Sequence, residues 1–371
     1  LWLSLAAIFF NLSLLLFGRH FALYSASPLF LALFAIPFVA ALRSKAFLVG
    51  ALAAALLTIH VSLIRTVPLD RSGGMLALID AAAEALLSGR NPYRERLEVP
   101  IGDRGFIYVP GLLLAYLPFK AAGVDIRYLN AGAAVLFWLY VTLTGWRRKE
   151  GGSWRAETLL TFAILTSPNV CHLISTKHTF FYGVLLFLLT VFVGRMRATA
   201  SSLLLGLVFV LRQFSVVLAP AVMSATRGRW LSNLAWLTVV VIAVFGPFMA
   251  LDPEGFPAVV SGRIVVDRYD DVPVDWSLNY SPGSGNSFNL GHVIKSILPA
   301  WSSALTMAVA ALLEAAVLLA LVKGRLPPVH AMYFAYASYL AFTINFSDYM
   351  LWDNLCIGWA IGWQRWRESL T

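Results

Sequence analysis

Arg212 is a charged residue in the middle of an apolar run, GLVFVLRQFSVVLAP, at residues 206–220. A charge at the depth of a lipid bilayer is costly, so such a residue is usually paired or faces a functional cavity. Two chemistries follow for Arg212. It either binds a phosphate group of a ligand or forms a structural ion pair, for which Glu314 in AALLEAAVLL is the partner we consider.

Asp80 and Glu84 stand four residues apart in MLALIDAAAEALLS, residues 75–88. The segment is rich in Ala and Leu and has no Gly or Pro, which predicts a helix. Its two acids share one face. The apolar face holds Leu76, Ile79, Ala83, Leu86 and Leu87. The segment is too short to cross a bilayer, so we predict a helix that lies in the membrane interface and ends at Gly89 and Pro92.

The composition places these residues in a membrane protein. Of the 371 residues, 59% are hydrophobic and 13% are charged, whereas a soluble domain normally carries about 25% charged residues. Apolar runs of about the 20 residues that a helix needs to cross the hydrocarbon recur along the chain. The formal net charge of +9 comes from short basic clusters between these runs. We interpret them as topology signals and expect no nucleic-acid partner.

The apolar runs predict an all-α fold, a polytopic transmembrane bundle of about 10–12 spans. We expect one domain over residues 1–371. The predicted spans cover residues 1–18, 23–42, 46–64, 128–146, 156–172, 179–194, a broken pair across 200–225, then 230–250, 300–322, 328–346 and 350–364.

Basic residues in the short loops set the predicted orientation, because cytoplasmic loops are rich in Lys and Arg. These residues are Arg43, Lys45, Arg147, Arg148, Lys149, Arg155, Arg195, Arg197, Arg227, Arg229, Lys323, Arg325, Arg365 and Arg367. The orientation requires that residues 66–127 do not cross the membrane. It also requires that residues 200–225 enter and leave the membrane on the cytoplasmic side, as two half-length helices. Residues 66–127 and 252–299 then form long external segments, where we expect the chemistry.

The first external segment resembles a known family. IDAAAEALLSGRNPYRE (79–95) followed by YVPGLLLAYLPF (108–119) is similar to the first luminal loop of the GT-C glycosyltransferases. Within these, the resemblance is to the mannosyltransferase that adds the first mannose in GPI-anchor assembly and to bacterial polyprenyl-phosphate-mannose-dependent mannosyltransferases. Residues 206–220 with RGRW (227–230) resemble the family's Gly-rich helix, basic residue, Pro and basic cluster. GNSFNLGHVI (285–294) is weakly similar to its Asn-x-Ser loop.

The resemblance implies an inverting glycosyltransferase of GT-C type, with interfacial helices in its first external loop. It implies a sugar donor linked to polyprenyl phosphate, most simply a mannose, and a lipid-linked or cell-surface glycan as acceptor. The protein would be a multi-pass protein of a bacterial plasma membrane, in contact with membrane lipid, with its active site facing outside. An Asp of the first external loop would act as general base, and cations would bind the donor phosphate.

The acids that the family carries just upstream of Asp-Ala-Ala are replaced here. The stretch reads RSGGML, with Gly73 and Met75 about where the acidic pair stands. Three residues are therefore candidates for the catalytic base. Asp80 lies on the polar face of the predicted helix, Asp70 follows the third span in PLDRSGG, and Asp103 lies in IGDRGF. Each also has a purely structural interpretation. Asp80 could lie on a solvent-exposed helix face, Asp70 could be a loop residue, and Asp103 could cap a turn.

Cations outside the apolar runs are further candidates for donor-phosphate binding, beside Arg212. Lys177 and His178 lie in the short external turn STKHTF, and Arg263 lies in the second external segment. Arg268, in the same segment, could likewise bind the donor phosphate or be a solvated loop residue. For Lys177 and His178, a solvated turn is the simpler interpretation.

The sequence predicts no certain cofactor. Asp348 and Asp353, in NFSDYMLWDN where the last two spans meet, could line a cavity or bind a divalent cation, and a polar turn is the simpler interpretation. Cys171 and Cys356 are too few for a disulfide framework or a metal site.

Two further functions compete with the enzyme. One is a non-catalytic GT-C relative, or a ligase or polymerase of pre-assembled glycans. The other is a transporter, which would also contain broken helices and an intramembrane Arg. A transporter is expected to show two halves with matching interrupted segments, and the sequence shows no internal repeat.

Overall fold

A computed structural model of the chain describes residues 45–69, 74–99, 104–106, 108–146, 153–177, 179–254, 256–257, 297, 302–343 and 347–368. Over these residues the fold is mostly helical, which confirms the predicted all-α class. The predicted spans at 1–18 and 23–42, and most of the second external segment, lie outside the described residues.

The first described helices run from residue 45 to residue 194. They are α4 (Lys45–Thr66), α5 (Gly74–Leu87), α6 (Pro110–Ala121), α7 (Tyr128–Trp146), α8 (Ser153–Leu165), α9 (Pro168–Thr176) and α10 (Thr179–Gly194). Two short strands, β1 (Arg96–Leu97) and β2 (Arg104–Gly105), pair antiparallel between α5 and α6.

The remaining elements follow from residue 198. They are α11 (Ala198–Leu211), η2 (Gln213–Leu218), α12 (Ala219–Ala225), η3 (Arg227–Arg229), α13 (Trp230–Leu251), α17 (Ser302–Val322), α18 (Pro328–Thr343) and α19 (Ser347–Glu368). The bounds of α7 and α10 coincide with the predicted spans, and those of α13 differ by one residue.

Among the described residues, three helices are long and apolar enough to cross a membrane, namely α4, α7 and α13. A fourth such span exists if the bent pair formed by α8 and α9 counts as one. Several other apolar helices, including α10 and α11, are shorter. The total of about 10–12 spans stays a prediction.

The chain divides into two compact units. The first consists of Leu1–Glu84, Glu98–Gly102 and Tyr116–Val184. The second consists of Ala85–Leu97, Asp103–Ala115 and Leu185–Thr371. The division passes through α5, α6 and α10. The single domain expected over the whole chain stays a prediction.

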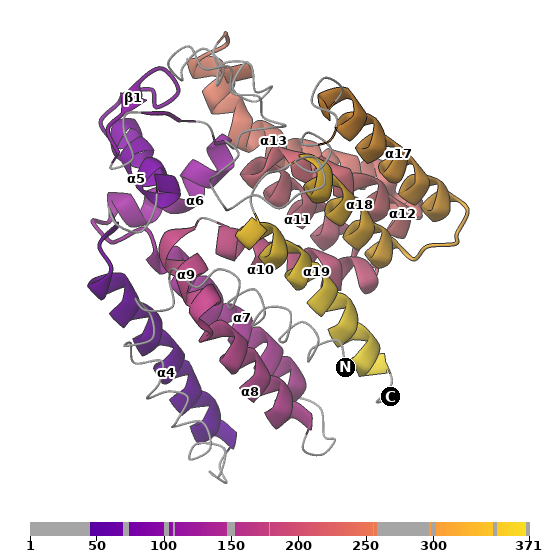
Figure 1. Cartoon of the computed structure of the whole chain (residues 1–371), viewed down its shortest axis with the longest axis horizontal. Helices are drawn as coiled ribbons and strands as arrows, with labels where there is room; N and C mark the ends of the chain where they lie inside the picture. Colours follow the sequence, from indigo (N-terminus) through magenta and orange to yellow (C-terminus); the bar gives the residue numbers. More distant parts are fainter. Residues whose placement is uncertain are drawn as a thin grey trace. The chain divides into compact units, whose positions relative to one another are not determined.

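In the first unit, α4, α7 and α8 pack side by side (Figure 1). Leu56 of α4 and Trp138 of α7 are fully buried there. The Trp138 indole is satisfied as well, because its Nε1 donates a 3.0 Å hydrogen bond to the backbone oxygen of Thr158 in α8. The three helices therefore share an apolar core, and the Trp138 indole links α7 to α8 within it.

Arg127 joins the end of α4 to the start of α7. Its guanidinium donates to the backbone oxygens of Ile64 at 2.7 Å and Val67 at 2.5 Å. Asp125 neutralises the buried guanidinium through a 2.6 Å ion pair. The last carbonyls of a helix have no partner within the helix, so this arginine caps α4 and positions the chain for α7.

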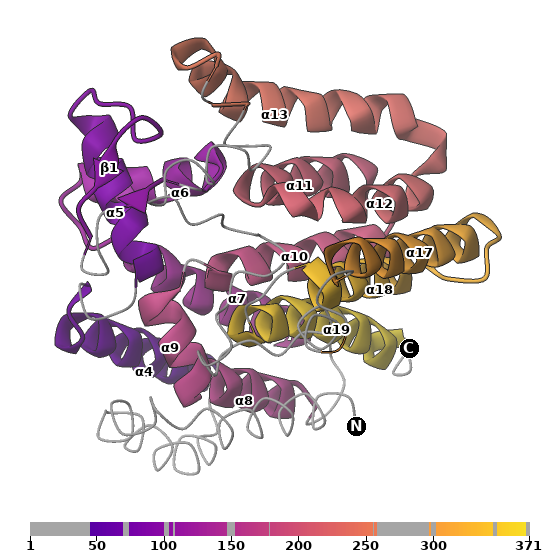
Figure 2. The same ribbon diagram turned by 45° about the horizontal axis from the view of Figure 1, so that its top comes forward.

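In the second unit, α13 packs along α11, and α18 packs against both α17 and α19 (Figure 2). Gly206 of α11 allows the first of these contacts, since a Cβ there would lie 2.9 Å from the Cβ of Val240 in α13. At the end of α10, Gln364 of α19 donates to the backbone oxygen of Val191 at 2.9 Å.

The predicted helix at 75–88 is present as α5, and it ends as the sequence predicts. Gly89 has φ +74°, a left-handed conformation that suits glycine. Its N–H bonds to the oxygen of Leu86 and that of Arg90 bonds to Ala85, which is the Schellman pattern of a helix end. The apolar face is buried at Leu76, Ile79 and Ala83, but Leu87 is 49% exposed.

The segment after Phe106 also forms a short helix, α6, which begins at Pro110 and contains Pro118. Its 12 residues span about 18 Å, less than the ~30 Å of a bilayer core. A short apolar helix of this length fits the interfacial helices that the family resemblance implies for the first external loop. Its end at Gly123, with φ +67°, repeats the Schellman pattern of α5.

The predicted break in the segment 200–225 occurs at Arg212. This residue has an extended backbone, with φ −153° and ψ 109°, between the end of α11 and the start of η2. The start of α11 and the end of α12 line the same pocket. After the break at Arg212, the chain therefore runs back to the end of the second unit at which α11 begins. This is the geometry that two half-length helices require.

The predicted span at 156–172 is wrong as a single straight helix. The chain bends by 53° between Trp154–Leu165 and Val170–Thr176. Pro168 lies at the bend and begins α9. A proline has no N–H to continue the hydrogen-bond pattern of the preceding helix, and it is well suited to the first turn of a new one.

Gly111 gives a first testable prediction. A Cβ at Gly111 would collide with the carbonyl oxygen of Val210 and would lie 2.7 Å from its carbon. Gly111→Ala is expected to lower the free energy of unfolding by about 1–3 kcal/mol, because backbone must move to relieve the overlap. Chemical denaturation of the purified protein in detergent measures this change.

Gly132→Ala is the matched control in a helix. No atom lies within 4 Å of a Cβ built at Gly132 of α7, so the same substitution is expected to raise the free energy of unfolding by about 0.5–1 kcal/mol. Equal effects at the two positions would contradict the close packing of Gly111.

Candidate functional site

Lys120 of α6 bridges two carboxylates of α5 in the first unit. Its Nζ lies 2.8 Å from Oδ2 of Asp80 and 2.9 Å from Oε2 of Glu84. The side chains of Lys120 and Asp80 are mostly buried, with 23% and 24% exposed, whereas that of Glu84 is 64% exposed. The Asp80 carboxylate, predicted as a general base, is thus shielded from water and held by a cation.

Local sequence explains why this cluster forms. Asp80 and Glu84 are four residues apart, so a helix places them on one face within reach of a single cation. Lys120 lies in the last turn of α6, where the helix dipole favours a positive charge. Gly123 then ends the helix directly beyond it. We define Asp80, Glu84 and Lys120 as the lysine–dicarboxylate cluster.

The charge state of Lys120 follows from two opposed effects. Burial lowers the pKa of Lys120, but the hydrogen bonds and charges of Asp80 and Glu84 raise it by more, so its pKa lies above the ordinary value. Lys120 is therefore protonated at neutral pH. The stability that it contributes is present there and is lost only as the pH rises through this elevated pKa.

A second contact ties α6 to the turn that carries Lys177. The Tyr116 hydroxyl, one helical turn before Lys120, donates a 3.1 Å hydrogen bond to Oδ1 of Asn130. The Asn130 amide donates in turn to the backbone oxygens of Ile174 at 3.1 Å and Lys177 at 2.9 Å. Tyr116 and Asn130 are both fully buried. The first unit thus joins the helix of Lys120 to the turn that carries a predicted phosphate-binding residue.

Arg212 forms a buried ion pair in the second unit. Its Nη1 donates to Oδ2 of Asp353 at 2.9 Å, and the Tyr336 hydroxyl donates to the same oxygen at 3.0 Å. Arg212 is 7% exposed and Asp353 is fully buried. The predicted pairing with Glu314 is wrong. The polar-turn interpretation of Asp353 is wrong as well, because Asp353 lies inside α19.

The segment GRNPYRE is anchored in the second unit by Asp252, at the end of α13. Arg94 donates to both Asp252 oxygens, from Nε at 2.9 Å and from Nη2 at 2.6 Å, and Asn91 donates at 3.3 Å. Asp252 is 1% exposed. Its ion pair and hydrogen bond raise the pKa of Arg94 above the ordinary value. A bidentate pair of this kind fixes orientation as well as charge.

Tyr93 of the same segment is the centre of an aromatic cluster. Its ring meets those of Phe106, Phe248 and Phe256 edge-on, at centroid distances of 5.3, 5.8 and 5.7 Å. Its hydroxyl donates to the backbone oxygen of Tyr108 at 2.9 Å, and burial raises its pKa well above the ordinary value. In this structure the Asn-Pro-Tyr residues have a packing role.

The structure places only some of the predicted site residues. Asp80 and Lys177 belong to the first unit, and Arg212 belongs to the second. The predicted candidates Asp70, Asp103, His178 and Arg263 lie outside the described residues.

Sequence reasoning missed two residues that the structure makes prominent, Lys120 and Asp252. Lys120 carried a signal, since it is a single cation within the apolar stretch YLPFKAAG. Asp252 carried no such signal in the sequence, apart from its position among other acidic residues. Its partners, Asn91 and Arg94, lie far away in the chain.

Metal-binding side chains do not gather in the part of the chain that the structure describes. No group of three or more His, Cys, Asp or Glu residues there is arranged to hold a metal ion. Cys171 and Cys356 are both buried and free. The divalent cation considered from the sequence therefore gains no candidate site among these residues.

Comparison with known proteins finds no family model, curated protein or solved structure that matches this chain. The class of this protein is therefore described from its fold and its contacts alone. The chain is a mostly helical protein with helices that are long and apolar enough to cross a membrane, and it carries a lysine–dicarboxylate cluster on two short helices.

Proposed function

We propose that this chain is a membrane glycosyltransferase that moves a sugar, most simply mannose, from a polyprenyl-phosphate donor to a lipid-linked or cell-surface glycan. The observation that carries the proposal is the lysine–dicarboxylate cluster. It places a mostly buried carboxylate and a cation together on two helices, α5 and α6, that are too short to span a bilayer. A lipid-linked donor presents its phosphate and sugar at the membrane interface, where short apolar helices bind.

The cluster supplies the two groups that this reaction needs. The acceptor hydroxyl oxygen attacks the anomeric carbon, the bond from that carbon to the phosphate oxygen breaks, and polyprenyl phosphate leaves with its negative charge. Asp80 takes the proton of the acceptor hydroxyl as general base. Lys120 offers N–H donors to the phosphate oxygens, so Glu84 and the donor phosphate compete for the same cation.

The proposed location is a bacterial plasma membrane, with the reaction on its outer face. Support for this comes from the basic residues of the short loops and from the resemblance of residues 79–119 to a luminal loop. On this orientation α5 and α6 face outside, where the donor sugar and the acceptor glycan are both accessible.

A transporter is the second candidate, and one observation favours it. The helix pair α11 and α12 is interrupted at Arg212, and transporters place interrupted helices and buried charges at their binding sites. The Arg212–Asp353 pair, however, leaves this charge already neutralised. A protein that binds a lipid-linked glycan without transferring it is the third candidate.

Transfer by the purified wild-type protein tests the proposal. The protein in lipid nanodiscs is incubated with radiolabelled polyprenyl-phosphate mannose and with lipid-linked or cell-wall glycan acceptors, and the labelled product is separated from donor. Polyprenyl-phosphate glucose and GDP-mannose serve as alternative donors. We expect transfer from a lipid-linked donor and none from GDP-mannose.

Two results would redirect the assignment. Saturable binding of the lipid-linked sugar, with no transfer from any donor, would favour a non-catalytic relative. Passage of a labelled glycan across sealed proteoliposomes, without a change in its chemical structure, would favour a transporter.

A further inference from the structure

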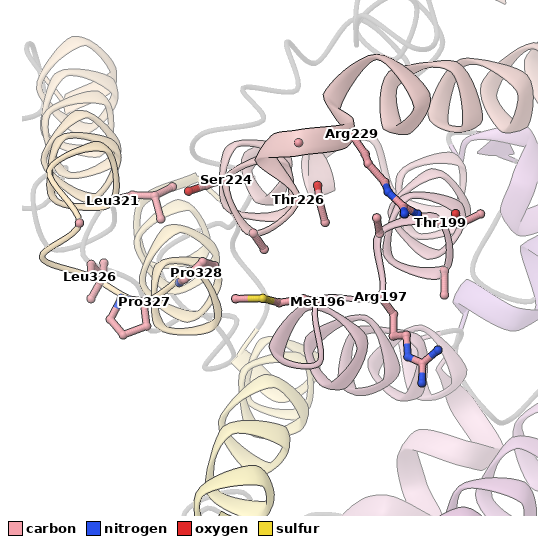
Figure 3. Close-up of a pocket in the computed structure, with 15 residues that line it drawn as sticks. Met196, Arg197, Thr199, Ser224, Thr226, Arg229, Leu321, Leu326, Pro327 and Pro328 are labelled. Atoms are coloured by element: carbon pink, nitrogen blue, oxygen red, sulfur yellow. The ribbon is translucent and has the colours of Figure 1, made fainter.

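A pocket of about 1030 Å³ lies in the second unit where three connections meet (Figure 3). Its walls come from the link between α10 and α11, from the end of α12 with η3, and from the link between α17 and α18. The sequence predicts each of these connections to be a basic cytoplasmic loop. Their meeting at one end of the unit is what that orientation requires.

One wall of the pocket is cationic and carries hydroxyl groups. Arg229 extends from the start of α13 toward the first turn of α11, which carries Thr199, while the side chain of Arg197 points away from Arg229 at the rim (Figure 3). No Asp or Glu lines the pocket. Over the described ranges, neither arginine side chain forms an ion pair with a carboxylate. Exposed guanidinium groups without a carboxylate partner are good ligands for phosphate oxygens.

The opposite wall is apolar. Met196, Leu321 and Leu326 line it together with two prolines (Figure 3). The outer face of α17 leads away from this wall, and its side chains at Leu318, Leu319 and Val322 are 44%, 53% and 66% exposed. A ligand that fills the pocket therefore meets cations on one side and exposed apolar side chains on the other.

We propose that this pocket binds the phosphate headgroup of an anionic phospholipid from the cytoplasmic leaflet. The phosphodiester lies by Arg229 and the rim residue Arg197, and the acyl chains lie over Leu326 and the exposed face of α17. Basic pockets between membrane helices on the cytoplasmic side are suited to anionic headgroups. The proposal does not depend on the glycosyltransferase assignment, because the lysine–dicarboxylate cluster belongs to the other unit.

The apolar wall favours a lipid over a soluble phosphate. Inorganic phosphate or glycerol phosphate would use the two arginines but would leave Met196, which is 74% exposed, and Leu326 in contact with water. A phospholipid covers both walls at once, and burial of its chains adds to the attraction of the charges.

Lipid binding to matched charge variants tests the proposal. The purified protein in a zwitterionic detergent is titrated with phosphatidylglycerol or phosphatidylcholine, and bound lipids are counted by native mass spectrometry. Wild type is compared with Arg197→Gln/Arg229→Gln and with Arg195→Gln/Lys323→Gln. The second pair removes the same charge from exposed residues of the same loops that do not line the pocket.

We expect wild type to bind phosphatidylglycerol more tightly than phosphatidylcholine. Loss of both pocket arginines is expected to weaken phosphatidylglycerol binding by roughly 30-fold, about 5-fold for each charge. The control pair is expected to weaken it by less than about 3-fold, because these side chains lie outside the pocket. Equal weakening by the two pairs would overturn the proposal, since it would show attraction to the whole basic surface.

Two further measurements test the site independently, one by competition with soluble phosphates and one by hydrogen–deuterium exchange. Millimolar inorganic phosphate or glycerol 3-phosphate is expected not to displace the lipid, and full displacement would assign the pocket to a soluble phosphate instead. If the pocket variant fails to fold, hydrogen–deuterium exchange of wild type in nanodiscs replaces it. Phosphatidylglycerol is expected to protect residues 196–200 and 224–229 relative to phosphatidylcholine, and unchanged exchange there would contradict the site.

Discussion

Asp80→Asn is expected to lower kcat/KM for transfer from polyprenyl-phosphate mannose by about 10²- to 10⁴-fold, which is the usual contribution of a positioned general base. An amide has nearly the same shape as the carboxylate and still accepts a hydrogen bond from Lys120, but it does not take the acceptor proton. The fold should therefore persist, and the measurement is the initial rate of labelled product formation by the purified variant.

Glu84→Gln is the control for this result. Glu84 contacts the same lysine at 2.9 Å but is 64% exposed, so its loss is expected to change the rate by only a few-fold. Asp70→Asn and Asp103→Asn are measured beside it, because both residues are candidates from the sequence. Full activity of Asp80→Asn with loss in one of these would move the base to that residue.

Asp353→Asn is expected to lower the free energy of unfolding by about 3–5 kcal/mol, because it removes the buried carboxylate that pairs with the guanidinium of Arg212. The pair is deeply placed, with Asp353 fully buried and Arg212 7% exposed. Denaturation of the purified variant in detergent measures the loss. Glu314→Gln is the matched control, because no described residue pairs with Glu314, and it is expected to change stability by less than about 1 kcal/mol.

A double substitution separates a structural ion pair from a binding role. Arg212→Met/Asp353→Leu removes both charges and fills the space with apolar atoms, so stability is expected to return to within about 1 kcal/mol of wild type. If the double variant stayed as unstable as Asp353→Asn, the ion pair would not be the source of the loss. The transfer rate of the double variant then tests the predicted phosphate-binding role of Arg212 without a folding defect.

The sequence predicts helices well where an apolar run ends in charged or turn-forming residues. α7 and α10 match their predicted bounds, and Gly89 ends α5 as expected, because glycine adopts the left-handed conformation that a helix end requires. The break at Arg212 was also predictable, since an unbroken span would carry that charge into the apolar interior.

Contacts between distant segments could not be predicted in the same way. The partner of Arg212 is Asp353, 141 residues away, whereas the sequence favoured Glu314, a single acid within an apolar run. The bend at Pro168 was hidden within a segment whose hydropathy is that of one span. Lys120 became important only when the packing of α5 and α6 brought it to Asp80.

The residues that carry the family resemblance divide into two groups in the structure. Asp80 belongs to the lysine–dicarboxylate cluster, whereas Tyr93 and Arg94 anchor the following segment through the aromatic cluster and Asp252. A short motif therefore combines one residue with the chemistry of a base and others that hold the segment in place. The resemblance to a transferase loop does not by itself separate these roles.

Photo-crosslinking of a lipid-linked donor to the wild-type protein tests the central claim most directly. A polyprenyl-phosphate mannose with a diazirine next to the phosphate is irradiated with the protein in nanodiscs, and the adducts are mapped by peptide mass spectrometry. The lysine–dicarboxylate cluster predicts adducts within residues 74–121 that unlabelled donor suppresses and that Lys120→Gln reduces. Adducts confined to other segments, or adducts that unlabelled donor does not suppress, would contradict a donor site on α5 and α6.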